Sequence, residues 1–129
     1  MDKKLYYKYL FIIGAIWNIV ASSSYILSSI FMLSIFPTYG VAVPVSMIWL
    51  HSFLFLVINL GIGYLIVSFD ISKNHGIVVI GIIAKLGYFL ISLIYFIIGD
   101  IGMLSVLSSS VDIIFSVLFL EFLINYKKL

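Results

Sequence analysis

The stretch Gly76–Ile98, GIVVIGIIAKLGYFLISLIYFII, decides the fold class of this chain. Its one charged residue is Lys85, and it is long enough to cross a bilayer, which takes roughly 20 apolar residues in a helix. The next stretch, Ile101–Ile124, is similar and carries Asp112 near its middle. A charged side chain at the bilayer centre costs about 2.5–3.5 kcal/mol on insertion scales, so such residues usually pair or line a polar path. The two stretches therefore predict membrane helices with charged groups in their interior.

The composition of the whole chain agrees with a location in lipid. Of its 129 residues, 64% are hydrophobic and 9% are charged, whereas a soluble domain carries about 25% charged residues. The lipid bilayer is thus the expected partner. The absence of cysteine excludes disulfides, thiolate-bound metals and thiol nucleophiles. The net charge of +2 comes from lysines near the termini and does not indicate nucleic-acid binding, and no cofactor is expected.

Four segments are long and apolar enough to span a membrane, and the connections between them are short. Short connections make successive helices antiparallel neighbours. The sequence therefore predicts an all-α, up-down-up-down four-helix integral membrane bundle that forms a single domain, residues 1–129. The expected helices are 9–36, 44–69, 76–98 and 101–124.

The N-terminal region has two features of a secretory signal peptide, namely basic residues followed by an apolar run. Ser22–Ser24 would then be the cleavage region. However, the apolar core of a signal peptide is typically 7–15 residues long, and this run continues to Phe36. We interpret it as the first membrane helix.

The lysines predict the orientation of the bundle. Apart from Lys85, every lysine falls on one side of a four-helix arrangement, and the positive-inside rule assigns that side to the cytoplasm. We expect a multi-pass protein of the cell inner (plasma) membrane with both termini cytoplasmic. The lysines on that side are Lys3, Lys4, Lys8, Lys73, Lys127 and Lys128.

The strongest polar residue of each helix is expected at the same depth. Counted from the cytoplasmic ends, these residues are Asn18, Asn59, Lys85 and Asp112. At 1.5 Å per residue, each lies roughly 14–18 Å deep, near the bilayer midplane. The coincidence predicts one polar layer across the interior of the bundle.

Each member of this layer also lies on a stripe of small and hydroxyl side chains with helical spacing. Such stripes are typical of helix contacts in lipid, because small residues permit close approach and hydrogen bonds. Tyr64, Tyr88 and Ser109 lie near the layer and complete the candidate ligand-binding set. The stripes are Gly14, Asn18, Ser22, Tyr25 and Ser29; Ser52, Asn59 and Gly63; Gly81, Lys85, Tyr88, Ser92 and Tyr95; and Ser105, Ser109, Asp112 and Ser116.

Two hypotheses compete for the charged pair. In the first, Lys85 and Asp112 form part of a site that binds or transports a small molecule, a lipid or an ion. In the second, the pair is a structural salt bridge in an accessory subunit, and the two asparagines satisfy its remaining hydrogen-bonding groups. A Schiff base on Lys85 and a membrane enzyme are weaker alternatives, so no catalytic residue is assigned. Self-association fits a chain this small, although no motif fixes its stoichiometry.

Three further titratable residues are candidates for metal binding or ion pairing. His51, with Met47 one turn before it, could ligate copper or haem. A membrane histidine more often bonds to a nearby serine or carbonyl, so no metal site is assigned. His75 is too far from His51 to share a ligand. Glu121 lies near the cytoplasmic headgroups, where a terminal lysine could pair with it.

A diffuse pattern runs through the last seventy residues or so. It resembles small four-helix bacterial membrane proteins of general DoxX-like appearance. The resemblance implies the four-helix fold and no particular activity. The residues that carry it are Gly61-Ile62-Gly63-Tyr64, Asp70, His75, Gly81, Lys85, Asp112, Phe119 and Phe122-Leu123, with Trp17-Asn18 as an extension.

Overall fold

The computed structural model describes residues 2–129, and within them every regular element is helical. The four long helices are each long and apolar enough to cross a membrane. The predicted all-α four-helix bundle is thereby confirmed. The long helices are α1 (Lys3–Phe31), α2 (Met47–Phe69), α3 (His75–Ile97) and α4 (Met103–Asn125), and the short 3₁₀ turns are η1 (Leu33–Ile35), η2 (Pro37–Tyr39) and η3 (Tyr126–Lys128).

The helix boundaries differ most from the expected ones in the first helix. α1 begins at Lys3 instead of residue 9, because the Asp2 side chain caps the helix by accepting a hydrogen bond from the Lys4 amide at 3.1 Å. It ends at Phe31 instead of residue 36, where the chain passes into η1 and η2. α2 begins at Met47 instead of residue 44, after an extended residue at its N-cap. The boundaries of α3 and α4 lie within two residues of expectation.

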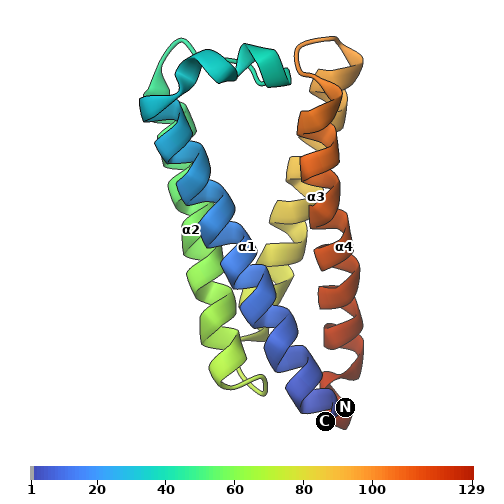
Figure 1. Cartoon of the computed structure of the whole chain (residues 1–129). Coiled ribbons are helices and arrows are strands. Elements are labelled where there is room, and N and C mark those ends of the chain that lie inside the picture. Colours follow the sequence, from blue (N-terminus) through green and yellow to red (C-terminus); the bar gives the residue numbers. More distant parts are fainter. Residues whose placement is uncertain (1) are drawn as a thin grey trace.

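The bundle consists of two helical hairpins (Figure 1). α1 packs along α2, and α3 packs along α4, whereas contacts between the hairpins are far fewer. The hairpins meet at the end that holds both termini and diverge toward the opposite end (Figure 1). We call these the terminal end and the far end.

At the far end the hairpins touch again through two glycines. The Gly102 amide donates a hydrogen bond to the Gly40 carbonyl at 2.8 Å. A Cβ atom at Gly40 would lie 2.7 Å from the Gly102 Cα atom, and Gly40 has a φ of +67°. Only glycine fits both the left-handed conformation and the close approach.

The core is aromatic and lies toward the terminal end. Tyr7 and Phe11 of α1 pack against Phe122 of α4, with ring centroids 5.1 and 4.9 Å apart. Phe119 of α4 contacts Phe11 at 5.0 Å and Tyr64 of α2 at 4.9 Å. Aromatic pairs add about 0.5–1.5 kcal/mol each beyond the area they bury. This aromatic cluster closes the terminal end of the bundle.

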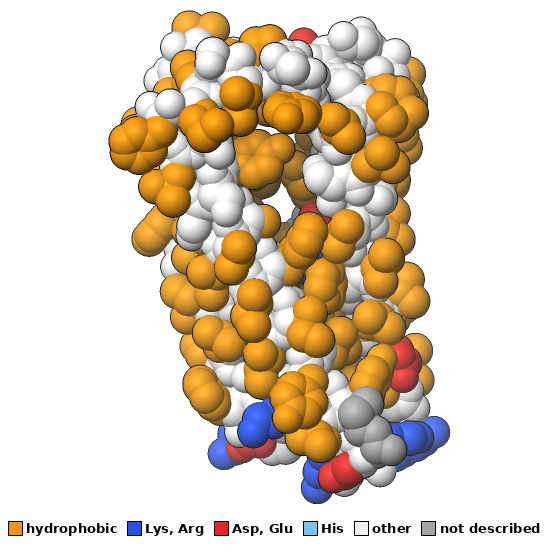
Figure 2. All heavy atoms as spheres, in the orientation of Figure 1, with side chains coloured by type: hydrophobic (Ala, Val, Ile, Leu, Met, Phe, Trp, Pro, Cys, Tyr) orange, Lys and Arg blue, Asp and Glu red, His pale blue; other side chains and the backbone are white. Residues whose placement is uncertain are grey.

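The face of the bundle drawn in Figure 2 is largely apolar along its length, and its basic side chains gather at the terminal end. The α2–α3 loop at that end is held by an exposed ion pair, with the Lys73 Nζ atom 3.0 Å from an Asp70 oxygen. Hydrogen bonds from Ser72 and Lys73 stabilise the carboxylate and lower the pKa of Asp70 to about 2. The loop is therefore both solvated and structured.

Candidate functional site

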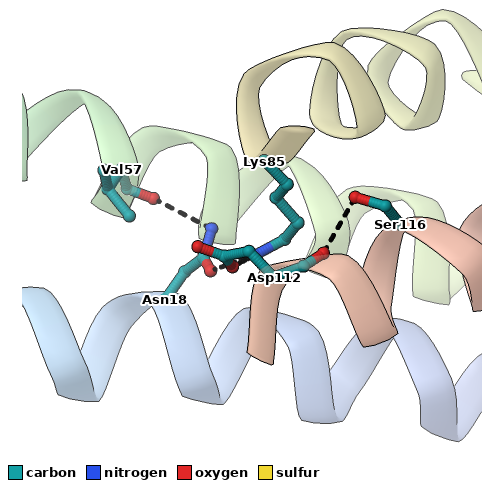
Figure 3. A network of polar contacts seen from close by, with 5 residues as sticks. All are labelled: Asn18, Val57, Lys85, Asp112 and Ser116. Atoms are coloured by element: carbon teal, nitrogen blue, oxygen red, sulfur yellow. Dashed lines mark hydrogen bonds and ion pairs between the residues drawn. The ribbon is translucent and has the colours of Figure 1, made fainter. Parts of the chain in front are cut away.

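The predicted pairing of Lys85 with Asp112 is confirmed, and the pair joins α3 to α4 (Figure 3). The Lys85 ammonium donates to Asp112 Oδ1 and, at 3.1 Å, to Asn18 Oδ1 on α1. Asn18 Nδ2 in turn donates to the Val57 carbonyl of α2 at 3.4 Å. One polar network therefore links all four helices.

The two charged side chains differ in exposure. Lys85 keeps 5% of its side chain accessible and Asp112 keeps 14%. Aromatic rings flank the ammonium group, with the Phe115 centroid 5.1 Å and the Tyr64 centroid 5.9 Å from Nζ. Ring faces attract cations, most strongly where water is excluded. The lysine is therefore enclosed, whereas the carboxylate reaches the edge of the packed interior.

Tyr64 lies beside this network because α3 carries a glycine at the point of contact. A Cβ atom at Gly81 would lie only 2.5 Å from the Tyr64 hydroxyl oxygen. Tyr64 is fully buried, and its hydroxyl has no hydrogen-bond partner within residues 2–129. A buried polar group left unsatisfied costs about 1–3 kcal/mol. This hydroxyl is thus a free donor and acceptor inside the bundle.

The network has further unused hydrogen-bonding capacity. An ammonium group has three donors, and Lys85 uses two of them within the described chain. Asp112 binds the lysine through Oδ1, which leaves Oδ2 as a free acceptor. The Ser116 hydroxyl bonds at 2.8 Å to the backbone carbonyl of Asp112 and does not occupy that carboxylate.

A hollow lies between the hairpins where they diverge toward the far end. Figure 2 shows it as an opening in the molecular face, with an acidic side chain visible inside. On the α2–α3 side, Phe53 and Tyr88 approach each other across the gap, with ring centroids 5.5 Å apart. Under η1 and η2 there is a pocket of about 240 Å³. Its lining is mostly apolar and consists of Ser24, Tyr25, Ser28, Ile35, Phe36, Tyr39 and Val41.

Most of the predicted site residues lie in or beside the network. Lys85 bonds directly to both Asn18 and Asp112, and Tyr64 lies next to them. Tyr88 is 37% exposed and stacks on Phe53. Ser109 is buried, but its hydroxyl donates at 2.9 Å to the Val106 carbonyl of its own helix.

Asn59 is the exception, because the structure does not bring it into the layer. It is exposed on α2 and makes no hydrogen bond with the described residues. The buried face of α2 runs through Leu54, Gly61, Tyr64 and Ser68, and Asn59 points away from it. The sequence prediction turns α2 about its axis so that Asn59 faces the interior, whereas in the structure that face is exposed. The Val57 backbone carbonyl takes the place expected for the Asn59 side chain, and no side-chain pattern signals a carbonyl.

The other polar residues have local partners. His51 Nε2 lies 2.9 Å from the Ser29 hydroxyl, which is the histidine–serine contact that the sequence favours. Glu121 accepts a hydrogen bond from the Tyr7 hydroxyl at 3.0 Å instead of pairing with a terminal lysine. Within residues 2–129, no three His, Asp or Glu side chains gather closely enough to hold a metal ion.

Comparison of the chain with protein-family models, with curated proteins and with solved structures finds no match. The DoxX-like resemblance stays a prediction. The functional argument therefore depends on the site alone.

Proposed function

We propose that this chain is an integral membrane protein that binds a small ligand at the Lys85–Asp112–Asn18 network and admits it through the hollow. The observation that carries the proposal is the unused hydrogen-bonding capacity at the inner end of an opening. One Lys85 donor, one Asp112 oxygen and the Tyr64 hydroxyl have no partner within the described chain. Of these, the Tyr64 hydroxyl is a buried atom, and a buried polar group usually has a partner, which a ligand would supply.

We infer that the terminal end faces the cytoplasm of the cell inner (plasma) membrane. Six lysines support this orientation under the positive-inside rule. The aromatic cluster then separates the network from the cytoplasm, and the hollow belongs to the outer half of the bilayer.

The route into the site favours a ligand that is dissolved in the membrane. At the far end, η1, η2 and the Gly40–Gly102 contact lie over the hollow and restrict entry from water. The side between α1 and α4 is less closed, because these helices pack together mainly through Phe11, Phe119 and their neighbours near the terminal end. A molecule in the outer leaflet can therefore reach the network laterally.

The charge of the site favours a neutral head group. Lys85 and Asp112 neutralise each other, so an ionic ligand would bury an unpaired charge, which is costly. A neutral head with a carbonyl or hydroxyl group could accept a hydrogen bond from Lys85 and donate to or accept from Tyr64. The aromatic wall at Phe53 and Tyr88 suits an apolar body.

An accessory role in a membrane complex is the second candidate. It is favoured by the way Asn18 uses both ends of its carboxamide, one for Lys85 and one for the Val57 carbonyl. These two hydrogen bonds hold three helices together without any contribution from a ligand.

The double variant Lys85→Met/Asp112→Leu separates the two roles, because it removes both charges while keeping the interior filled. We expect wild-type protein extracted in mild detergent to retain a lipid-phase molecule, seen by mass spectrometry, that the folded double variant lacks. Ser108→Ala, on the exposed face of α4, is the control and should retain the molecule. If the folded double variant retains the same molecules and the same cellular phenotype, the binding role is refuted. Loss of a co-purifying protein with no change in bound molecules would favour the accessory role.

A further inference from the structure

The exposed face of α2 carries a regular seam of residues at steps of three and four. This is the heptad spacing with which one helix packs along another. Every member of the seam is exposed in the single chain. The α2 seam consists of Ser52, Phe55, Asn59, Ile62, Ile66 and Phe69.

Asn59 lies at the centre of this seam and next to the midpoint of α2. Its carboxamide can donate and accept hydrogen bonds, yet it has no partner within residues 2–129. Hydrocarbon offers no hydrogen bond at that depth, so the exposed amide is unfavourable unless another protein group meets it.

From this seam we propose that two copies of the chain pair along α2, with Asn59 of one copy bonded to Asn59 of the other. Copies inserted with the same orientation have parallel α2 helices, so a two-fold axis along the membrane normal brings identical residues together. Two carboxamides related by that axis are self-complementary, because each can donate one hydrogen bond and accept one. A single asparagine within an apolar seam is also the device that fixes register in paired helices.

A second copy is a better occupant of the seam than an unrelated protein. It supplies a matching amide at the correct depth in every membrane that contains the chain. Ser52, one heptad from Asn59, also meets its counterpart across the same axis. Bulky residues at the intervening positions, such as Phe55 and Ile62, provide the apolar contact.

The chain contains no cysteine, so a single introduced thiol is the only group that can form a disulfide in a cross-linking test. Ser52→Cys introduces a thiol on the seam, five residues after the start of α2. Ser108→Cys is the matched control, since Ser108 is also exposed and lies five residues after the start of α4. In vesicles containing the purified chain alone, we expect mild oxidation to give a disulfide-linked dimer with Ser52→Cys and only collisional background with Ser108→Cys.

Asn59→Leu tests whether the amide drives the association. We expect it to weaken dimerisation roughly tenfold, measured by energy transfer between labelled chains in vesicles, because it removes both amide hydrogen bonds of the pair, and each contributes about 0.6 kcal/mol on average in double-mutant cycles of membrane helices. Asn59→Gln, which keeps the amide, should preserve most of the association. Because residue 59 is exposed, circular dichroism should show unchanged helix content in both variants. Equal cross-linking at positions 52 and 108, or an unchanged dimer affinity in Asn59→Leu, would overturn the proposal.

Discussion

The Lys85–Asp112 pair should behave as one unit in a double-mutant cycle. Lys85→Met leaves a carboxylate without its cation, and Asp112→Leu leaves an enclosed ammonium whose described partner is the Asn18 carbonyl oxygen. Removing one partner of a buried ion pair typically costs about 3–5 kcal/mol. We therefore expect each single variant to lose about that much unfolding free energy.

Neutralisation of the remaining group sets an upper limit on the electrostatic part of each loss. Protonating an ordinary carboxyl at pH 7 costs about 4.2 kcal/mol, and deprotonating an ordinary lysine costs about 4.6 kcal/mol, from their usual pKa values and 1.36 kcal/mol per unit. The double variant buries no charge and loses mainly the hydrogen bond to Asn18. It should therefore lie within about 2 kcal/mol of wild type.

Reversible unfolding in mixed micelles at pH 7, followed by circular dichroism, measures the unfolding free energy of wild type, the two single variants and the double variant. Single variants within 1 kcal/mol of wild type, or a double variant as unstable as the singles, would refute this reasoning.

Other regions of the chain give three smaller predictions. Gly81→Ala should lower the unfolding free energy by about 1–3 kcal/mol, because its Cβ atom would lie 2.5 Å from the Tyr64 hydroxyl. Gly87→Ala is the control in the same micelle assay and should leave the unfolding free energy unchanged, because no atom lies within 4 Å of its Cβ position. Gly102→Ala should separate the far ends of the hairpins, because its Cβ atom would lie 3.0 Å from the facing Gly40 backbone. The distance between spin labels on η2 and at the start of α4 should then increase, whereas the Gly87→Ala control should leave that distance unchanged. The lowered pKa of Asp70 means that the folded loop favours the ionised carboxylate. The stabilisation of the loop by this carboxylate is therefore present above about pH 4 and is lost as pH falls toward about 2. Amide hydrogen exchange in the loop should report that loss, and in Asp70→Asn the exchange should no longer show this pH dependence.

The number and type of the helices were predictable because the length and polarity of a membrane segment are local properties of the sequence. The pairing of Lys85 with Asp112 was predictable because two charges at one depth in neighbouring helices have few other partners. The hollow was not predictable. It depends on how far the two hairpins diverge, and the aromatic cluster at one end and a glycine contact at the other set that divergence.

The misplacement of Asn59 has a physical cause that applies beyond this residue. Polar side chains occur on both faces of α2, so they do not define how the helix is turned. Gly61 does, because a Cβ atom there would lie 2.8 Å from the Ile19 side chain and 3.1 Å from the Ala15 carbonyl. Small residues mark the faces where helices approach closely in lipid. Had α2 been oriented by Gly61 and Tyr64, Asn59 would have been expected to face outward, and its unpaired amide would have indicated a partner outside the single chain.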